Sequence, residues 1–354
     1  MSYTDGIAAI NLEMPPRVPR TEYSVEMHYD VIKAVTGIVV SSESSEKEIS
    51  DAANALRKAW NFDFIWNIRV GSGSEFLGKY YTDMGHANYN AVGSDFRHIG
   101  KSAFNDEDDV LAFDAVECLK TYNQNELVEM FNNDYRAKVE SFPDAVNMTG
   151  IYITCMSGLI DLFGWDLLLA AAGVDPKGFG RVTQRYTDWI MQFYEALAKC
   201  NSPVVMVHDD ITWTSGAFLH PEWYRQYVFP SYKKIFSPLL EQGKKIIYTS
   251  DGNFTEFVDD IAECGVAGFV MEPCTDMKCI ADKYGNTHSF IGNADTRILL
   301  SGTKDDIYQE VKRCMDIGKS YPGFFMAVGN HIPPNTPIDN VLYYNDCYEK
   351  MSRR

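Results

Sequence analysis

The sequence predicts a single α/β domain with the architecture of a distorted (β/α)8 (TIM) barrel that has extra N-terminal helices. Three observations support this prediction. Short, continuous apolar strands recur between residues 202 and 340, and a stretch of helical period follows each strand. Continuous apolar runs of this kind are typical of a parallel sheet that is buried on both faces. Polar residues gather directly after the strands, where the active sites of such barrels lie.

The first 20 residues contain three prolines and no periodic apolar pattern, which predicts an arm that lies over the body or over a partner subunit in a homodimer. Residues 21–354 then form the single barrel domain, with two smaller domains as the alternative. Segments 25–35 and 44–60 have helical patterns. The second of these has acidic residues in its first half and basic residues in its last turn, as the helix dipole favours. Segment 62–70 is rich in aromatic and β-branched residues, which predicts a strand.

The rest of the chain alternates between strands and helices. Strands are expected at 146–154, 204–207, 245–248, 268–271, 288–291 and 324–328. Helices are expected at 125–142, 160–172, 179–199, 221–243, 254–264, 303–318 and 338–351. This alternation is typical of a parallel sheet whose strands are joined through helices.

The composition argues against several classes of partner. The formal net charge of -17 and the lack of a Lys/Arg-rich run argue against binding to nucleic acid or to an anionic membrane. No stretch approaches the length of an apolar membrane span, and the N-terminus lacks the pattern of a signal peptide, so the protein is expected in the cytoplasm. The 8 cysteines are scattered, which favours reduced thiols. Cys274 and Cys279 form a close pair, but no second pair accompanies them as in a tetrahedral zinc site.

The strand that ends at residue 207 runs into His208, Asp209 and Asp210, which are the first candidates for catalysis. An imidazole and carboxylates at a strand end can do acid–base work or bind a metal. Because side chains alternate along a strand, His208 and Asp210 can share a direction while Asp209 points elsewhere. The alternative is that the aspartates cap the helix or turn that follows. Asn330, which a loop between glycine and proline holds after the last strand, is a fourth candidate.

Asp251, Glu272 and His331 each follow a different strand, and they are the predicted metal ligands. In a closed barrel these strand ends can converge on one point of the rim. Oxygen and nitrogen ligands with an open fourth position suit a catalytic Zn²⁺, and a set rich in carboxylates also accepts Mg²⁺ or Mn²⁺. The alternative is that no metal binds, with Asp251 as the N-cap of a helix that begins near residue 254 and Glu272 paired with a basic residue.

Aromatic and polar residues near the strand ends are the candidates for contact with a substrate, because small-molecule sites combine apolar walls with a few oriented polar groups. These candidates are Tyr81, His86, Tyr152, Trp213, Asn293 and Arg297. Two of them belong to the stretch 80–89, which combines Asp, His and Tyr without a helical or strand period. An ordinary surface loop is the alternative for that stretch, and local pairing is the alternative for Arg297.

Two motifs in the C-terminal part resemble the uroporphyrinogen decarboxylase superfamily. They are Gly292-Asn-Ala-Asp-Thr-Arg297 and Gly329-Asn-His-Ile-Pro333, and the resemblance extends over roughly residues 145–351. The superfamily implies a (β/α)8 barrel with its cleft at the carboxyl ends of the strands. The decarboxylases themselves have an N-terminal Arg-Gln-Ala-Gly-Arg motif that grips the carboxylates of the porphyrinogen, and this sequence lacks it. An acidic chain without that motif is a poor match to an octa-anionic substrate.

The other branch of the superfamily consists of corrinoid-dependent methyltransferases. The segment Arg17-Val-Pro-Arg-Thr-Glu-Tyr-Ser24 is similar to the N-termini of the aryl-ether O-demethylase methyltransferases, which use Glu and His as metal ligands. In the methanol and methylamine members, a His-x-Cys pair and a distant Cys hold zinc. The corresponding positions here are Thr249, Asp251 and Asn330, so a thiolate site is absent.

This resemblance implies a methyltransferase that moves a methyl group from a small donor, such as a methoxylated aromatic, to the cob(I)alamin of a separate corrinoid protein. Zn²⁺ would act as a Lewis acid on the donor, and the cobalamin would be a cofactor that the partner carries. A decarboxylase of the uroporphyrinogen type and a non-catalytic ligand-binding barrel are the alternatives.

Overall fold

The computed structural model describes residues 1–69, 72–85 and 102–354, and parallel strands form its centre. One sheet has the strand order β10-β9-β8-β7-β4-β3, and all its pairs are parallel. Its strands are β3 (Thr149–Ile151), β4 (Val204–His208), β7 (Lys245–Ser250), β8 (Gly268–Met271), β9 (Ser289–Ile291) and β10 (Phe324–Phe325). Nearly all of their side chains are buried, as expected for a sheet that is covered on both faces.

A second pair of strands extends this sheet at the β3 edge. Strand β1 (Phe64–Ile65) pairs in parallel with β2 (Val146–Asn147), which lies just before β3 in the chain. Further along the same two segments, a parallel bridge joins Arg69 to Ile151. The predicted strand at 146–154 therefore exists as two short pieces, and the described part of the strand predicted at 62–70 pairs with both of them.

The end of the segment that was predicted to be an N-terminal arm closes the ring. Arg20 forms a parallel bridge with Met326, next to β10, and its carbonyl accepts the amide of Asp63, next to β1. Residues 18–21 thus lie between the two free edges of the sheet. Together with the strands above, they complete the (β/α)8 barrel that the sequence predicts. Local pattern could not show that the last residues of the predicted arm pair with a strand about 300 residues away in sequence.

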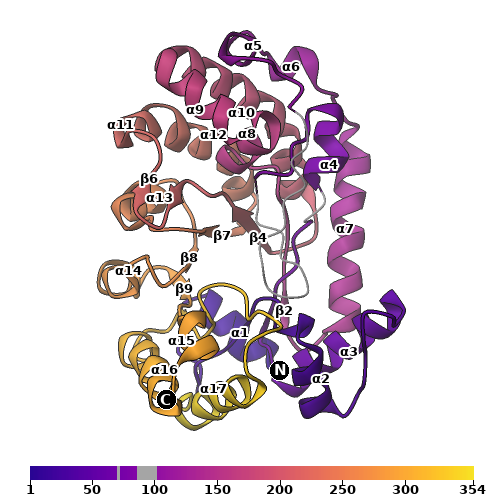
Figure 1. Cartoon of the computed structure of the whole chain (residues 1–354), viewed down its shortest axis with the longest axis vertical. Helices are drawn as coiled ribbons and strands as arrows, with labels where there is room; N and C mark the ends of the chain where they lie inside the picture. Colours follow the sequence, from indigo (N-terminus) through magenta and orange to yellow (C-terminus); the bar gives the residue numbers. More distant parts are fainter. Residues whose placement is uncertain (70–71, 86–101) are drawn as a thin grey trace.

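The extra N-terminal helices are present, and the first of them covers the amino-terminal end of the barrel. Helix α1 (Tyr3–Ile10) packs there, where the Ser289 hydroxyl at the start of β9 donates to the Ala9 carbonyl. Helices α2 (Tyr29–Thr36) and α3 (Glu46–Ala59) follow, after a single turn η1 (Val25–Met27). Both chain ends lie in the lower part of the molecule as Figure 1 shows it.

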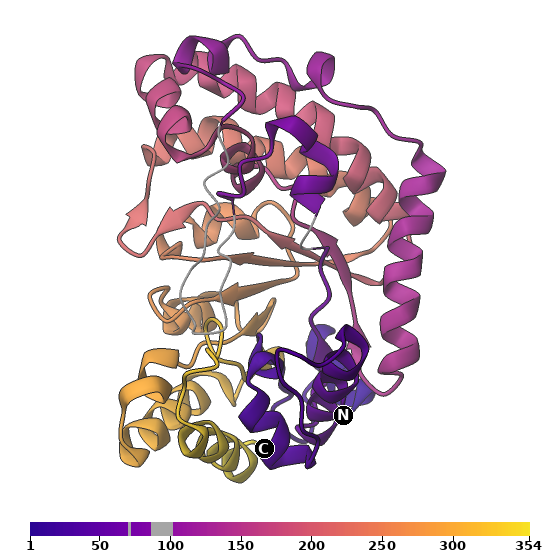
Figure 2. The same ribbon diagram turned by 45° about the vertical axis from the view of Figure 1, so that its right-hand side comes forward.

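The remaining helices connect the strands and surround the barrel, and the long α7 stands along one side in both views (Figure 2). Along the chain, the helices before the six-stranded sheet are α4 (Ser72–Leu77), η2 (Gly78–Tyr80), α5 (Glu107–Leu111), α6 (Ala115–Cys118) and α7 (Gln124–Ser141). After β3 come α8 (Met156–Phe163), α9 (Trp165–Val174) and α10 (Pro176–Lys199). After β4 come a hairpin of β5 (Thr212–Trp213) and β6 (Gly216–Ala217), then α11 (Pro221–Trp223), η3 (Tyr224–Val228) and α12 (Phe229–Glu241). The last elements are η4 (Thr255–Phe257), α13 (Val258–Ala262), α14 (Met277–Tyr284), α15 (Thr296–Ser301), α16 (Lys304–Gly318) and α17 (Ile338–Met351).

The helix predicted at 160–172 is in fact two helices, α8 and α9. Gly164 separates them with a φ of 77°, a left-handed conformation that glycine adopts without the strain of a Cβ atom. The two helices bend by 107° at this break. Within the described parts of the chain, no single helix has both the length and the apolar character needed to cross a membrane, and α8 and α9 satisfy that test only as this bent pair.

We expect Gly150→Ala to destabilise the protein, because β3 lies too close to β4 for a side chain at this position. A Cβ atom on Gly150 would lie 2.5 Å from the backbone carbonyl oxygen of Met206, which cannot move without disturbing the sheet. Overpacking of this kind costs about 1–3 kcal/mol. Gly173→Ala in α9 is the control, since its Cβ would meet no atom within 4 Å. Urea unfolding of both variants tests the prediction, and equal free energies of unfolding would contradict it.

Candidate active site

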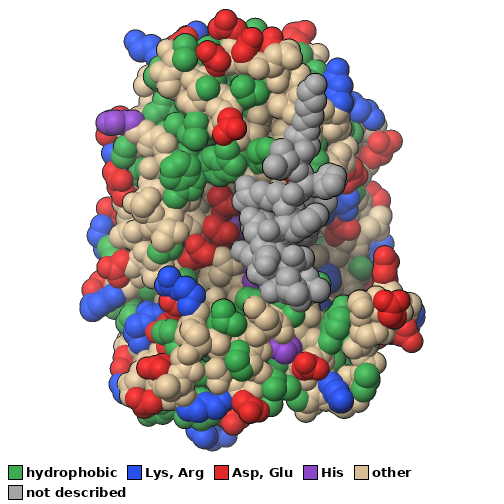
Figure 3. Space-filling view, viewed as in Figure 1, with side chains coloured by type: hydrophobic (Ala, Val, Ile, Leu, Met, Phe, Trp, Pro, Cys, Tyr) green, Lys and Arg blue, Asp and Glu red, His purple; other side chains and the backbone are tan. Residues whose placement is uncertain are grey.

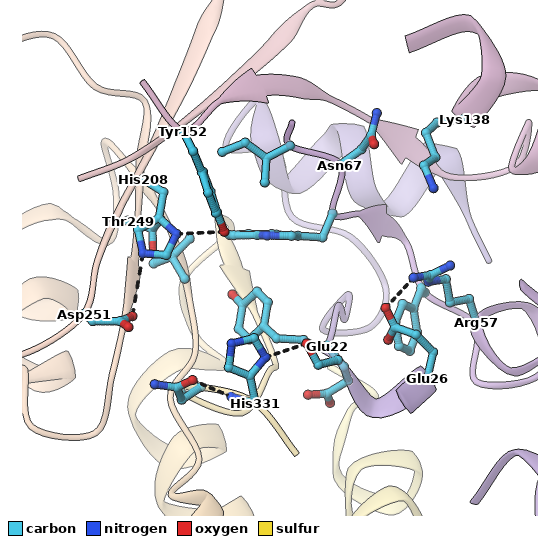
Figure 4. A pocket seen from close by; sticks show the side chains of 18 residues that line it. Glu22, Glu26, Arg57, Asn67, Lys138, Tyr152, His208, Thr249, Asp251 and His331 are labelled. Carbon is cyan, nitrogen blue, oxygen red and sulfur yellow. Dashed lines mark hydrogen bonds and ion pairs between the residues drawn. The ribbon is translucent and has the colours of Figure 1, made fainter. Parts of the chain in front are cut away.

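A cavity of about 320 Å³ opens at the carboxyl ends of several strands. Its apolar and aromatic walls are formed by Tyr23, Phe62, Trp66, Ile68, Tyr152 and Val270. Its polar and charged lining is contributed by Glu22, Ser24, Glu26, Arg57, Asn67, Lys138, His208, Thr249, Asp251, Asn330 and His331. In Figure 4, His208 and Asp251 lie on one side of this cavity, and Lys138 and Arg57 lie on the other.

An imidazole and two carboxylates converge on the first side of the cavity. His208 is the last residue of β4, Asp210 follows two residues later, and Asp251 follows β7, which is the neighbour of β4 in the sheet. The His208 Nε2 atom lies 3.1 Å from the Asp210 carboxylate and 3.8 Å from the Asp251 carboxylate. All three ligand atoms lie within 4.8 Å of one another. We call these three residues the His208 group.

Two hydrogen bonds fix the geometry of the His208 group. The second imidazole nitrogen, Nδ1, lies 3.3 Å from the Tyr152 hydroxyl, so the ring presents Nε2 to the two carboxylates. The backbone amide of Asp251 donates to the Asp210 carboxylate at 2.8 Å, which ties the end of β7 to the end of β4. A ring held through one nitrogen while the other faces carboxylates is the usual arrangement of a metal-binding histidine.

The electrostatics of the His208 group favour a positive charge between its members. Burial lowers the pKa of His208, but the carboxylates of Asp210, Asp251 and Asp209 outweigh it and raise the pKa to about 9. Burial and the nearby Asp210 carboxylate raise the pKa of Asp251 to about 8, although His208 opposes this. The group therefore retains protons at neutral pH. A bound divalent cation would replace these protons and relieve the same repulsion.

This donor set fits a catalytic metal ion. One imidazole nitrogen and two carboxylate oxygens provide three protein ligands, and the cavity leaves a further position open for a substrate. The Asp251 side chain is 42% exposed, and this exposure faces the cavity, which leaves its oxygens accessible to an ion. The predicted ligand set was Asp251, Glu272 and His331. Asp251 belongs to the group, the other two lie beside it, and His208 and Asp210 are the residues that the structure brings together with Asp251.

Asp209, which was predicted to be a catalytic residue, is fully buried and does not line the cavity. Its fully buried carboxylate accepts hydrogen bonds from the Thr154 hydroxyl, from the amides of Met156 and Ser157, and from the Tyr232 hydroxyl. The two amides are the first of α8, so Asp209 caps that helix. The alternation along the strand predicts this opposite direction, and the alternative that an aspartate caps a helix is correct for Asp209, although the helix is α8 and not the one that follows.

Glu272 contacts the loop that carries Asp251, and among the described residues it forms no ion pair with a basic side chain. Its carboxylate accepts the Gly252 amide at 2.7 Å and also accepts the side-chain amide of Asn330. Gly252 follows Asp251 directly, so Glu272 positions the loop that carries this carboxylate. Asp251 is not the N-cap of the next helix, because Phe254 occupies that position of η4 and makes no side-chain cap. Within the described part of the chain, neither the cap by Asp251 nor an ion pair of Glu272 is therefore observed.

His331 lines the cavity as a neutral imidazole. Its Nδ1 atom contacts the Ser24 hydroxyl, and Asn330 accepts its backbone amide at 2.7 Å. Burial, together with the positive charge of His208, lowers the pKa of His331 to about 4. The neutral ring can therefore accept a hydrogen bond from a molecule in the cavity at neutral pH.

We expect the neutral His331 to make the protein less stable in mild acid. The unfolded chain binds a proton at His331 near the ordinary pKa of 6.5, whereas the folded chain does so only near 4. The free energy of unfolding should therefore rise with pH between about 4 and 6.5, by at most about 3 kcal/mol from this residue. In His331→Asn this rise should be smaller. His220→Asn, at an exposed helix cap, is the control, and an unchanged slope in His331→Asn would contradict the prediction.

A second cavity of about 280 Å³ lies on the other side of Asn330 and His331. Its wall includes Glu272, Cys274 and Arg297. Arg297 pairs with Asp295 in a local ion pair, which was the alternative interpretation of this residue, and its side chain is 80% exposed. Burial and the Glu272 carboxylate raise the pKa of Cys274 to about 11, so this cysteine carries a neutral thiol at physiological pH.

The predicted substrate residues do not form one set. Tyr152 lines the first cavity, and Arg297 lines the second. Trp213 packs against Trp165 and Phe218 on the β5–β6 hairpin and is absent from both linings. Asn293 is buried among the carbonyls of Glu272 and Thr275 and the guanidinium of Arg313, and Tyr81 is likewise absent from both linings. His86 lies outside the described residues.

Several cavity residues were not among the sequence candidates. Trp66 and Ile68 alternate along the strand that begins at β1, so period two predicts that they share one face with Phe62. Tyr23 and Lys138 have no comparable local signal. Tyr23 lies just after the segment that closes the barrel, and Lys138 lies on α7, which is outside the ring of strands.

A closed ring of parallel strands joined through helices is a (β/α)8 barrel. An imidazole and carboxylates at the carboxyl ends of its strands are typical of the enzymes with this fold. The chain belongs to the uroporphyrinogen decarboxylase family, whose model (Uroporphyrinogen decarboxylase, URO-D) matches residues 113–351. The matched part includes the whole His208 group, and it confirms the superfamily that the two C-terminal motifs predict.

Individual relatives agree with this assignment. Uroporphyrinogen decarboxylase from Syntrophotalea carbinolica is 28% identical over 178 residues, and the one from Geotalea uraniireducens is 26% identical over 179 residues. The chain spans about half the length of the curated relatives it matches, 50% and 51% of these two. Among solved structures, a methyltransferase from Methanosarcina mazei is 16% identical, with 98% of each chain covered and a TM-score of 0.66. This last likeness supports the fold along nearly the whole chain.

Proposed function

We propose that this protein is a methyltransferase that moves a methyl group from a small donor, such as a methoxylated aromatic, to the cob(I)alamin of a separate corrinoid protein. The observation that supports it most is the His208 group on the wall of an aromatic cavity. Three nitrogen and oxygen ligands with an open position suit a catalytic Zn²⁺. The similarity in fold to a solved methyltransferase is consistent with this proposal.

The residues of the site have distinct roles in this reaction. His208, Asp210 and Asp251 would hold the ion, which when bound supplies a Lewis acid that makes the donor oxygen a better leaving group. Tyr152 keeps the His208 ring in place through Nδ1, and Glu272 keeps the loop of Asp251 in place through the Gly252 amide. Trp66, Tyr23 and Tyr152 supply the flat walls that bind an aromatic ring and exclude water from it.

The charges of the cavity favour this reaction over decarboxylation of a porphyrinogen. A substrate with many carboxylates needs several unpaired cations, and guanidinium groups are the best of them. Among the described residues of the lining, the guanidinium of Arg57 is already paired with Glu26, and Lys138 is the only other lysine or arginine. Figure 3 shows acidic side chains gathered near the centre of the face that it presents. Such a surface repels a polyanion.

The test is a direct assay for methyl transfer. The protein, loaded with Zn²⁺, is mixed with cob(I)alamin and a panel of methoxyarenes, and methylcobalamin is followed by its absorbance. We expect methylcobalamin from at least one donor. Release of CO2 from uroporphyrinogen would instead favour the decarboxylase, and tight binding of a methoxyarene without any product would favour the non-catalytic barrel. Either outcome, without methylcobalamin, contradicts the proposal.

A further inference from the structure

Tyr23 has a buried hydroxyl group without a hydrogen-bond partner. The residue is 8% exposed, and among the described residues no donor or acceptor lies within hydrogen-bond distance of its hydroxyl oxygen. A buried polar group that lacks a partner is unfavourable, and each one in a folded protein calls for an explanation. A ligand that supplies the missing partner is such an explanation.

The position of Tyr23 suits a ligand at the His208 group. Its ring stands edge-on against Trp66, with the ring centres 4.6 Å apart, and both residues line the cavity. Burial raises the pKa of Tyr23 well above its usual value, and the carboxylates of Glu22 and Asp251 raise it further. The hydroxyl therefore keeps its proton at neutral pH and can donate it in a hydrogen bond.

The carboxylate that precedes Tyr23 in the chain is already engaged. One oxygen of Glu22 accepts hydrogen bonds from the Arg20 guanidinium and the Tyr344 hydroxyl, and the other accepts the amide of Val328. A ligand in the cavity can supply the acceptor that Glu22 does not.

The backbone after Tyr23 has an unusual conformation that fits this role. Consecutive residues of an extended chain point in opposite directions, yet Tyr23 and Ser24 both line the cavity. Ser24 has a φ of 55°, in the left-handed region that is uncommon for residues other than glycine, and its hydroxyl contacts the Nδ1 atom of His331. Backbone strain of this kind gathers at functional sites.

We propose that the Tyr23 hydroxyl donates a hydrogen bond to the oxygen atom from which the methyl group leaves. This inference rests on the proposed function. When the bond between the methyl carbon and the oxygen breaks, its electron pair stays on the oxygen, and cob(I)alamin supplies the pair for the new bond to carbon. An aryl ether thereby becomes a phenolate. The hydrogen bond strengthens in the transition state, because an ether oxygen is a weak acceptor and a phenolate oxygen is a strong one.

Calorimetry in the absence of cob(I)alamin tests the hydrogen bond with two ligands. One is 4-nitrophenolate, which resembles the product, and the other is 4-nitroanisole, which resembles the methyl donor. We expect full-length, Zn²⁺-loaded Tyr23→Phe to bind the phenolate about 10–100-fold more weakly than the wild type does, since it lacks a hydrogen bond to a charged group. Its affinity for the anisole should stay at the wild-type level, because the ring that forms the cavity wall is kept.

The stability of the variant separates this role from a structural one. Tyr23→Phe removes an unpartnered polar group, so its urea midpoint should be equal to that of the wild type or higher. Tyr194→Phe is the matched control, because the Tyr194 hydroxyl on α10 is also buried without a partner among the described residues, but Tyr194 is absent from both cavity linings. The control should leave both affinities unchanged.

In turnover, Tyr23→Phe should lower kcat by about 100-fold and leave KM nearly unchanged, as expected for a contact that is made mainly in the transition state. Unchanged phenolate affinity in Tyr23→Phe, an equal loss for both ligands, or an unchanged kcat would overturn the inference. If phenolate binding depends on Tyr23 but the wild type yields no methylcobalamin from any donor, the hydrogen bond stands and the proposed reaction fails, so the two failures are distinguishable.

Discussion

Asp251→Asn is expected to remove the bound metal and to lower methyl transfer by about 10³-fold. The amide is nearly the shape of the carboxylate, but it lacks the negative charge that a divalent cation needs from this ligand. Loss of even a supporting residue costs about 10–100-fold in metal affinity, so loss of a direct ligand should cost at least as much. Lewis-acid assistance amounts to several kcal/mol, which corresponds to this loss in rate. Elemental analysis and the methylcobalamin assay measure the two effects.

The same variant should be folded and, without metal, more stable than the wild type in mild alkali. Because the pKa of Asp251 is raised in the folded state, the unfolded chain loses this proton first as the pH rises from about 4 to about 8. Ionisation of Asp251 therefore destabilises the fold over that range, whereas the side-chain amide of the variant does not ionise.

Asp295→Asn is the matched control for both measurements. Asp295 also follows a strand and caps α15, where asparagine is an equally good cap, but it belongs to the second cavity. Metal content and methyl transfer should stay at the wild-type level in this control. Equal metal content in Asp251→Asn and the wild type, or no metal in either, would remove the His208 group from the mechanism.

Asp209→Ala is expected to have the largest effect on stability, a loss of about 3–5 kcal/mol in the free energy of unfolding. The substitution removes a buried acceptor. Four hydrogen-bond donors then lose their partner, namely the hydroxyls of Thr154 and Tyr232 and the amides of Met156 and Ser157. A buried donor that loses its partner costs about 1–3 kcal/mol, and rearrangement recovers part of the sum. Urea unfolding measures the loss, and one below about 1 kcal/mol would contradict the role of Asp209.

Tyr232→Phe provides the graded comparison, because it removes the Tyr232 hydroxyl and leaves the cap on α8 intact. A loss of about 1–2 kcal/mol is expected. If the two substitutions cost the same, the amides of α8 contribute little and the tyrosine is the main partner of Asp209.

The sequence by itself predicted the barrel and the edge where the site lies. Both follow from local periodicity, because a parallel sheet buried on two faces requires continuous apolar strands, and the carboxyl ends of such strands meet at one rim. Period two along β4 also separated His208 and Asp210 from Asp209 without any knowledge of the fold. The two C-terminal motifs identified the superfamily, which the family model confirms.

The tertiary structure decided which strand ends meet. β4 and β7 are hydrogen-bonded neighbours in register, so His208 and Asp251 come within 3.8 Å of each other, whereas Glu272 on the next strand turns to the Gly252 amide. Lys138 reaches the cavity from a helix outside the ring, and the N-terminal segment closes the barrel against Met326. Each of these contacts joins residues far apart in sequence. Local pattern carries no information about them, because register and packing between distant segments are settled only when the whole core is assembled.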